Sequence, residues 1–320
     1  MKKLLVMKFG GTSVGSAERM RVAARLSIEQ SRKRPVLIVV SAMAGVTDLL
    51  IESTKHAEGG DRSGLEENTR KLEERHIETC RELLPGAKQK PVLAGIRELV
   101  GEFQRITRGM LMLNDRPPRS VDESIAIGER LSALMMAAYL NAQGTKAEPM
   151  NARDLIVTDA VFGSASPLMD QTTEKARKRL LPLLRRGVLP VVTGFNGSTA
   201  DGRPTTLGRG GSDFSASILS AALEAAELWI WTDVDGIMTA DPRLVPDAAV
   251  LDEVTYREAA ELAYNGAKVL HPRTLAPLVE SQIPVWSKNS FALHKPGTKI
   301  VSRLAVSSGA RAVTSLARVA

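Results

Sequence analysis

The sequence has little sulfur and few aromatic side chains. Its 320 residues include one cysteine, Cys80, which excludes an intrachain disulfide and is typical of a reducing compartment. Tryptophan, tyrosine and phenylalanine together make up only 4% of the chain, so aliphatic side chains must form most of the core. The four histidines have no spacing typical of zinc ligands, and we name no metal-ligating residue.

Long hydrophobic runs are also missing. No apolar stretch approaches the roughly 18 residues of a membrane-spanning helix. The N-terminal segment is charged again at Lys8, before a signal-peptide core could form. We therefore expect a cytoplasmic protein with no membrane partner. With 43% hydrophobic and 25% charged residues, the chain should fold into one large core or two smaller lobes.

The chain is basic, with a net charge of +7 and a pI near 9.6. The basic residues gather in three short clusters, residues 32–34, 175–179 and 185–186, each at the polar side or the end of a predicted helix. Solvated helix faces account for most of this charge. No aromatic residues are interleaved with it, so we expect anionic small-molecule substrates and not nucleic acid.

Strand-like and helix-like segments alternate along the chain. Strands are predicted at residues 3–9, 35–41, 188–193, 228–232 and 284–287. Helices are predicted from residue 16, at 59–85 as an exposed helix, and at 91–113, 121–140, 171–186, 214–222 and 273–280. This alternation predicts an α/β sandwich with a mainly parallel central sheet. The turn-rich connection at residues 198–204 marks a boundary between two lobes.

A glycine-rich turn at residues 207–213 is the most informative stretch. Its sequence, LGRGGSD, runs directly into a predicted helix, so backbone N–H groups and the helix N-terminus could bind an anion. Arg209 could hold a carboxylate or phosphate, and Asp213 could orient a lysine or a metal. A helix simply capped by Ser212 or Asp213 is an equally good interpretation of the turn alone.

A second glycine turn follows the first strand. Lys8 stands just before Gly10 and Gly11, at a position where α/β proteins often bind phosphate. Neither the P-loop pattern nor the dinucleotide fingerprint is present. Lys8 either reaches a phosphate or is an exposed lysine at a strand end, which is the more frequent case. After the second strand, Ser41 and Thr47 either contact a ligand or cap the next helix.

Two other features leave alternatives open. Glu129 lies within an apolar helical stretch, and the sequence slightly favours a surface position over an inward carboxylate. The loop at residues 232–243 contains three aspartates, which could hold Mg²⁺ or a ribose or could be ordinary turn residues.

Six segments in order resemble the aspartokinases of the amino acid kinase family. They are KFGGTSV (8–14), VVSAM (39–43), GERLS (128–132), TLGRGGSD (206–213), WTDVDG (231–236) and GAKVLHP (266–272). The resemblance implies a three-layer αβα sandwich with two lobes. Residues 1–198 would bind the amino acid, residues 199–302 would bind ATP, and residues 303–320 would resemble the start of an absent ACT regulatory domain.

The resemblance also implies a reaction. With ATP and Mg²⁺, the γ-phosphoryl group would pass to the side-chain carboxylate of L-aspartate, giving 4-phospho-L-aspartate, the first step toward lysine, threonine and methionine. A carboxylate is already ionised at neutral pH, so no general base is required. The alternatives are another acyl-phosphate-forming amino acid kinase and a non-catalytic nucleotide or amino-acid sensor with the same fold.

Motif by motif, the resemblance implies three groups of site residues. Lys8, Asp213 and Arg209 would act in catalysis, with Lys8 on the transferring phosphoryl group and Asp213 orienting Lys8 or the metal shell. The residues that bind aspartate would be Thr47, Glu129, Phe195, Arg209 and Ser212. The residues that bind the nucleotide would be Lys8, Gly10, Gly11, Ser41, Thr232, Asp233, Met238, Arg243 and Lys268.

The sequence departs from these relatives at two places. Met238 stands where many of them carry a tyrosine that contacts adenosine. We also expect the usual paired ACT domains to be absent, and with them feedback inhibition by lysine or threonine. Because relatives make dimer contacts through those domains, the oligomeric state stays open, with a homodimer as one option.

Overall fold

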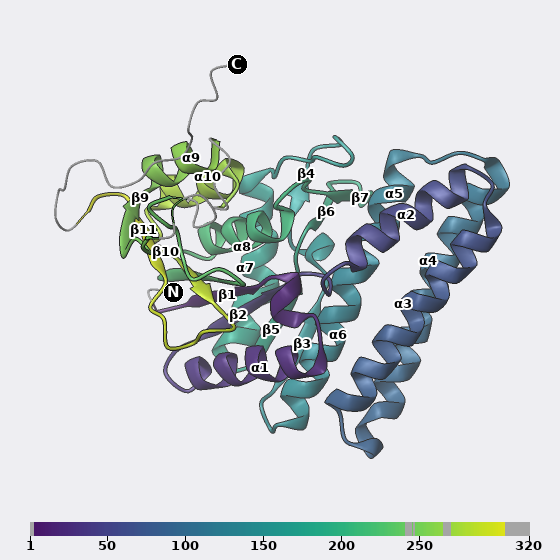
Figure 1. Ribbon diagram of the computed structural model, residues 1–320, viewed down its shortest axis with the longest axis horizontal. Helices are drawn as coiled ribbons and strands as arrows, with labels where there is room; N and C mark the ends of the chain where they lie inside the picture. The colour runs from purple at the N-terminus through teal and green to yellow at the C-terminus, as the bar shows by residue number, and fades with distance from the viewer. Residues whose placement is uncertain (1–2, 241–244, 246, 265–269, 305–320) are drawn as a thin grey trace.

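The computed structural model describes residues 3–240, 245, 247–264 and 270–304. Their centre is a sheet of eight strands in the order β3-β5-β2-β1-β8-β10-β11-β9 (Figure 1). In that order the strands are β3 (Ala147–Met150), β5 (Leu189–Thr193), β2 (Val36–Val40), β1 (Leu5–Phe9), β8 (Glu227–Thr232), β10 (Val285–Asn289), β11 (Thr298–Val301) and β9 (Glu253–Thr255). Every neighbouring pair is parallel except β10 and β11, which confirms the predicted mainly parallel sheet.

Ten helices surround the sheet in the described part of the chain. They are α1 (Ala17–Ser31), α2 (Val46–Glu58), α3 (Arg62–Leu83), α4 (Gly86–Leu113), α5 (Pro118–Ile125), α6 (Ile127–Ala142), α7 (Met169–Arg185), α8 (Gly211–Ala222), α9 (Tyr256–Tyr264) and α10 (Pro272–Ser281). Two short 3₁₀ turns are η1 (Gly11–Val14) and η2 (Ala152–Asp154). Within these described residues, no helix combines the length and the apolarity that a bilayer crossing requires.

The side chains of β1 divide between two hydrophobic cores. Leu5, Met7 and Phe9 belong to one core, and Val6 belongs to the other together with Leu4, the residue just before the strand. This alternation follows from the two-residue period of a strand. Because β1 lies in the middle of the sheet, all five of its residues are buried.

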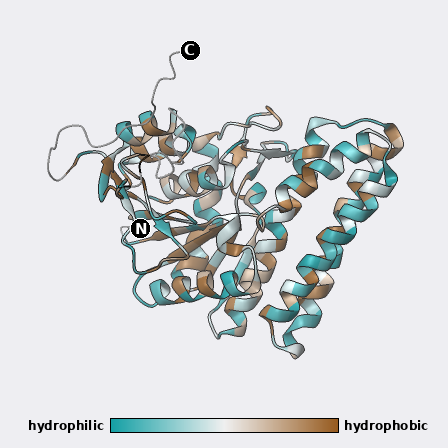
Figure 2. Ribbon diagram, in the orientation of Figure 1, coloured by the Kyte–Doolittle hydropathy of each residue, from teal (hydrophilic) through white to brown (hydrophobic). Residues whose placement is uncertain are grey.

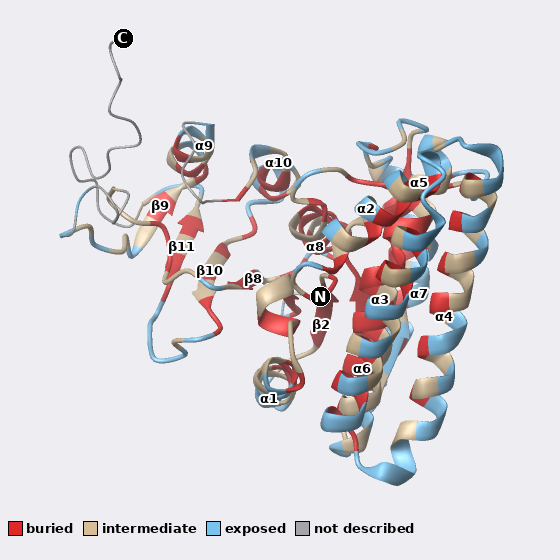
Figure 3. Cartoon of the chain, turned by 45° about the vertical axis from the view of Figure 1, so that its right-hand side comes forward, coloured by how far each residue is buried: buried red, intermediate tan, exposed pale blue. Residues whose placement is uncertain are grey.

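Helices cover both faces of the sheet, so the chain forms three layers. The first core includes buried residues of α1 and α6, and the second includes buried residues of α7, α8 and α10. Figure 2 shows the hydrophobic residues gathered in the central strands, and Figure 3 shows that these strands are buried. The predicted αβα sandwich is confirmed.

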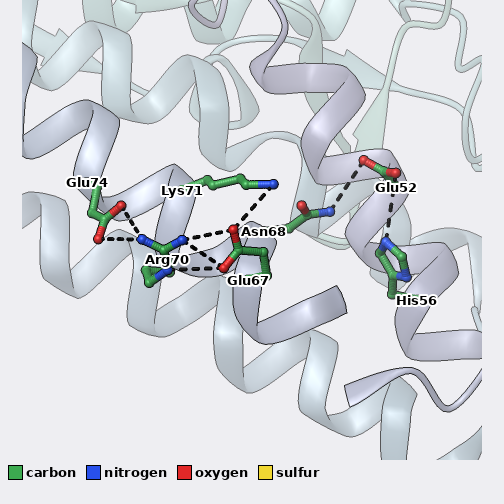
Figure 4. A network of polar contacts seen from close by, with 7 residues as sticks. All are labelled: Glu52, His56, Glu67, Asn68, Arg70, Lys71 and Glu74. Atoms are coloured by element: carbon green, nitrogen blue, oxygen red, sulfur yellow. Dashed lines mark hydrogen bonds and ion pairs between the residues drawn. The ribbon is translucent and has the colours of Figure 1, made fainter. Parts of the chain in front are cut away.

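Helices α3 and α4 form a long antiparallel pair at one side of the molecule (Figure 1). The prediction of an exposed helix at 59–85 was wrong for one face of α3, where Leu72, His76 and Cys80 are buried. The opposite face carries Arg70, which donates to the carboxylates of Glu67 and Glu74 (Figure 4). The helix is amphipathic although its composition is mostly polar. About three apolar side chains per two turns are enough to form a buried stripe.

The helix predicted at 121–140 is two helices. Ala126 is both the C-cap of α5 and the N-cap of α6, so the helix is interrupted within its apolar stretch. Helix α5 starts with Pro117 and Pro118, which suit a helix N-terminus because proline needs no N–H partner there.

A small second sheet lies between α8 and α5 (Figure 1). Its strands, in the order β4-β6-β7, are β4 (Val157–Thr158), β6 (Asn196–Thr199) and β7 (Pro204–Thr206). The predicted turn at 198–204 is the connection of the β6–β7 hairpin. The proposed lobe boundary after residue 198 therefore falls inside β6. Strand β4 before the boundary and strand β7 after it belong to the same small sheet.

Candidate active site

An open pocket of 710 Å³ lies beyond the carboxyl ends of β1, β2 and β5. Parallel α/β sheets commonly bind ligands at this edge. The pocket is lined by nine of the predicted site residues, which are Lys8, Gly11, Ser41, Thr47, Glu129, Phe195, Arg209, Ser212 and Asp213. These residues come from five separate stretches of sequence.

Lys8 points from the sheet toward α8. It follows Leu4 and Val6 in the alternation of β1, and both of those side chains pack in the core shared with α8. Its Nζ lies 2.6 Å from Oδ1 of Asp213, in the first turn of α8. Because Lys8 is only 7% exposed, the interpretation as an exposed lysine was wrong.

Gly10 and Gly11 keep the space next to the Lys8 ammonium free. A Cβ at Gly10 would lie 3.5 Å from the Lys8 Nζ, and a Cβ at Gly11 would lie 2.9 Å from the Ala42 carbonyl oxygen. The Gly10 N–H donates to the Trp231 carbonyl at 3.0 Å, which joins the end of β1 to the end of β8. The turn is thus shaped for close approach of a ligand to the backbone.

Glu129 is an inward carboxylate in the first turn of α6. It is 2% exposed, so the surface interpretation was wrong. Its Oε1 accepts from the Ala42 N–H at 3.1 Å, and its Oε2 has no hydrogen-bond partner among the described residues. Burial raises the pKa of Glu129 to about 8, although the Ala42 N–H and the charge of Lys8 act in the opposite direction. A buried acid with one free oxygen suits a cationic ligand.

The glycine-rich turn places Arg209 between two residues with left-handed backbone. Gly208 has φ 76° and Gly210 has φ 69°, values that favour glycine at both positions. Gly210 is the N-cap of α8 and no side chain caps this helix, so the interpretation of a helix capped by Ser212 or Asp213 was wrong. Arg209 is exposed, and no ion pair of its guanidinium is found in the described part of the chain.

Phe195 closes the pocket behind this turn. Its φ is 73°, a strained value for a residue with a Cβ. Its N–H donates to Ser215 Oγ at 2.9 Å, and its carbonyl accepts from the Leu207 N–H at 2.8 Å. A Cβ at Gly211 would lie 2.6 Å from Cδ2 of Phe195, so α8 approaches the ring as closely as a glycine allows.

Ser41 and Thr47 flank the start of α2. The N-cap of α2 is Gly45, and no side chain bonds to the first turn, so neither residue caps the helix. The Ser41 N–H donates to the Phe9 carbonyl at 3.1 Å. Both side chains are partly exposed in the pocket.

The residues predicted for the nucleotide are less closely gathered. Thr232 ends β8 and Asp233 follows it, beside the Gly10 turn, and Met238 forms a β-bridge with Val250. These three residues and Gly10 do not line the pocket. Arg243 and Lys268 lie outside the described residues.

Two carboxylates of the three-aspartate loop accept hydrogen bonds in the described structure, and Asp233 accepts from Thr232 Oγ1 at 3.3 Å. Asp235 accepts from Asn289 Nδ2 at 2.6 Å and from Lys295 Nζ. These bonds hold the pKa of Asp235 below its usual range. Asp233 is exposed, and Asp241 lies outside the described residues. No group of three acidic, histidine or cysteine side chains suited to a metal is found among the residues described.

Sequence reasoning missed three charged residues in the pocket wall, Asp48, Arg116 and Asp122. Asp122 is 1% exposed and lies seven residues before Glu129, but the two residues belong to separate helices, so their spacing gave no usable signal. Arg116 donates from Nε to Thr54 Oγ1 at 2.8 Å. The sequence gives no signal for Arg116 either, because it stands in a break between helices.

The sequence pattern of the amino acid kinase family matches residues 3–289. The chain belongs to this family. Lysine-sensitive aspartokinase 3 of Escherichia coli (strain K12) is 37% identical over 308 residues, which are 95% of this chain and 65% of that protein. A chloroplastic bifunctional aspartokinase/homoserine dehydrogenase 1 of Arabidopsis thaliana is 38% identical over 301 residues, 93% of this chain and 32% of that protein.

Solved structures agree with membership of the amino acid kinase family. The crystal structure of E. coli aspartokinase III in complex with aspartate and ADP superposes with a TM-score of 0.87 at 36% identity. It covers 94% of this chain and 65% of that one. The chain thus spans between about a third and about two thirds of the length of these relatives.

Proposed function

We propose that this chain transfers the γ-phosphoryl group of ATP to the side-chain carboxylate of L-aspartate, giving 4-phospho-L-aspartate. One observation carries the proposal. The Lys8–Asp213 ion pair, the buried Glu129 and the exposed Arg209 all line one pocket. The similarity to aspartokinases, one of them solved with aspartate and ADP, supports aspartate as the acceptor.

Two opposite charges suit the two ends of the amino acid. The Arg209 guanidinium would bind the α-carboxylate through a two-pronged contact, and the free Oε2 of Glu129 would accept from the ammonium group. Thr47 and Ser212 would add hydroxyl contacts, and Phe195 would close the wall. The side-chain carboxylate would then point toward Lys8.

The phosphoryl group would lie between Lys8 and the glycine turns. Lys8 would neutralise its charge, and Gly10, Gly11 and Ser41 would contact phosphate oxygens. The rest of the nucleotide would lie along Thr232, Asp233, Met238, Arg243 and Lys268. The Lys8 ammonium 3.5 Å from a Cβ at Gly10 and the Asp213 carboxylate beside it fit a magnesium-bound triphosphate, and Mg²⁺ would neutralise the phosphate charge.

Catalysis by this arrangement consists of alignment and charge neutralisation. The attacking carboxylate needs no deprotonation, so no histidine or other base is required in the pocket. The site instead brings two anions together and offsets their repulsion with Lys8 and Arg209.

The two-lobe assignment follows from these roles. Residues 1–198 would supply most of the acceptor contacts and residues 199–302 most of the nucleotide contacts, with Arg209 and Ser212 reaching across. Of the tail at 303–320, residues 305–320 lie outside the described residues. A cytoplasmic location and a homodimer stay predictions.

The proposal is tested by trapping the acyl phosphate with hydroxylamine. Purified protein is incubated with Mg·ATP and with aspartate, glutamate or no acceptor, and hydroxamate is measured. We expect aspartate-dependent hydroxamate that is lost in Lys8→Ala and retained in Lys71→Ala, a control at an exposed lysine on α3. ATP binding without hydroxamate would refute the proposal, and hydroxamate with glutamate alone would reassign the acceptor.

A further inference from the structure

The Arg209 turn rests on a loop from a distant part of the chain. The turn comprises residues 206–210, and the loop comprises residues 163–166. The Ala165 N–H donates to the Thr206 carbonyl at 2.8 Å. A Cβ at Gly208 would lie 3.1 Å from the Gly163 carbonyl oxygen, so the two backbones are in contact. The position of the turn therefore depends on the position of the loop.

Asp122 of α5 binds both segments from one side. Its Oδ2 accepts from the N–H groups of Gly163 and Thr206, each at 2.9 Å. Its Oδ1 accepts from Thr206 Oγ1 at 2.7 Å. The carboxylate is 1% exposed, so these three bonds form in a low-dielectric environment where they are strong.

Arg273 of α10 binds the same two segments through their carbonyls. Its Nη1 donates to the Leu207 carbonyl at 3.4 Å and to Ser164 Oγ at 2.9 Å. Its Nη2 donates to the Ala165 carbonyl at 3.1 Å. The guanidinium also lies 5.2 Å from the ring centroid of Phe214, which fixes its plane against α8.

The two side chains are chemically matched to the backbone between them. A carboxylate can only accept and takes the N–H groups, whereas a guanidinium can only donate and takes the carbonyls. Asp122 precedes residue 198 and Arg273 follows it, so the pair reaches the turn from both proposed lobes. Figure 1 shows the small sheet lying between α10 and α5. Arg273 does not line the pocket.

We propose that Asp122 and Arg273 clamp the Arg209 turn in the orientation that binds the acceptor carboxylate, so that Arg273 sets acceptor affinity from outside the pocket. The inference rests on the proposed function, because it assigns Arg209 to the acceptor. Both are positioning residues. A turn released from the clamp must be ordered when the acceptor binds, and that ordering costs conformational entropy.

The test compares Arg273→Gln with Arg257→Gln, which removes an equal charge from an arginine on α9 that is 89% exposed. We expect Arg273→Gln to raise the KM for aspartate about tenfold, while kcat and the KM for ATP change less than twofold. Arg257→Gln should change none of the three. Arg273→Lys should restore the KM for aspartate only in part, because one ammonium cannot bond to both the Leu207 and Ala165 carbonyls as the planar guanidinium does.

A double-mutant cycle of Asp122→Asn and Arg273→Gln tests whether the two residues act together on the turn or affect the KM for aspartate independently. Asp122→Asn places an amide against N–H groups and should also raise the KM for aspartate. If both residues act through one turn, the double variant should raise the KM by less than the product of the single effects. A multiplicative effect would contradict the clamp.

Three results would overturn the proposal: an unchanged KM for aspartate in Arg273→Gln, an equal rise in the KM for ATP, or a loss confined to kcat. Thermal denaturation checks folding, and if Arg273→Gln does not fold, Arg273→Lys decides by the same measurements. Wild-type protein that forms no aspartate hydroxamate would refute the proposed function. Wild-type activity with an unchanged KM in the variants would refute the clamp alone.

Discussion

Lys8 and Asp213 meet 2.6 Å apart although they are separated by more than two hundred residues. Lys8 leaves the carboxyl end of β1, and Asp213 stands in the first turn of α8, the helix that covers the same face. The carboxylate fixes a flexible ammonium at the point where the two glycine turns converge. The pair should therefore matter more for the rate than for stability.

Replacing Asp213 with asparagine keeps its shape and removes its charge. We expect kcat to fall about 10- to 100-fold, since Lys8 loses the partner that orients it, while the melting temperature changes little. Asp170→Asn is the matched control, because Asp170 is likewise in the first turn of a helix, α7, but is exposed and does not line the pocket. Both variants lose the same interaction with a helix dipole. Equal losses of kcat in the two would exclude a specific role for the ion pair.

Gly211 should tolerate no side chain. In Gly211→Ala the new Cβ would lie 2.6 Å from Cδ2 of Phe195 and 3.3 Å from Cβ of Leu207, so either α8 or the strained Phe195 must shift. We expect a loss of about 1–3 kcal/mol in the free energy of unfolding and a higher KM for aspartate. Denaturant unfolding and steady-state kinetics measure the two effects.

The control for this substitution is Gly109→Ala in α4. No atom lies within 4 Å of a Cβ built there, and the residue is inside a helix. Alanine should stabilise the protein by about 0.5–1 kcal/mol through helix propensity alone. If Gly211→Ala behaved like Gly109→Ala, the close contact between α8 and Phe195 would be wrong.

The strands and the glycine turns could be predicted because they depend on local sequence. Val36–Val40 is apolar throughout, as a strand buried on both faces requires. Lys8 could have been placed as well, since the alternation of β1 alone directs it to the face of Leu4 and Val6.

Glu129 and Asp122 could not be placed in this way. Burying a carboxylate is costly unless it is hydrogen-bonded, so sequence reasoning favoured the surface for Glu129. Its partner, the Ala42 N–H, is 87 residues away, and the partners of Asp122 are 41 and 84 residues away. Such contacts exist only after the chain has folded, and no local periodicity encodes them.

Aspartate binding should release a proton from Glu129. With a pKa of about 8 in the free protein, this carboxyl is mostly protonated at pH 7, and the ammonium group of the acceptor would favour its ionised form. Calorimetry at pH 7 in buffers of different ionisation enthalpy should detect release of up to about one proton per aspartate bound. Glu129→Gln should bind aspartate more weakly without proton release. Proton release that persists in this variant would assign it to another group.

Glu129 should also lower stability at high pH. Its folded pKa of about 8 lies above the ordinary value of 4.5, so the folded state binds more protons between these values. The free energy of unfolding should then fall as pH rises from about 4.5 to 8, with a contribution of at most about 1.4 kcal/mol per pH unit. Glu129→Gln should lose this contribution in urea unfolding measured across the range. An unchanged slope would show that Glu129 is ionised in the free protein.

His76 should have the opposite effect. It is fully buried in α3, its Nδ1–H donates to the Leu72 carbonyl at 2.7 Å, and burial lowers its pKa from 6.5 to about 4. The unfolded state therefore binds more protons between these values, so the free energy of unfolding should fall by up to about 3 kcal/mol as pH drops from 6.5 to 4. Urea unfolding of His76→Leu should lack this loss, and His294→Leu, on an exposed loop, should keep it. A loss retained in His76→Leu would mean that other groups cause the acid sensitivity.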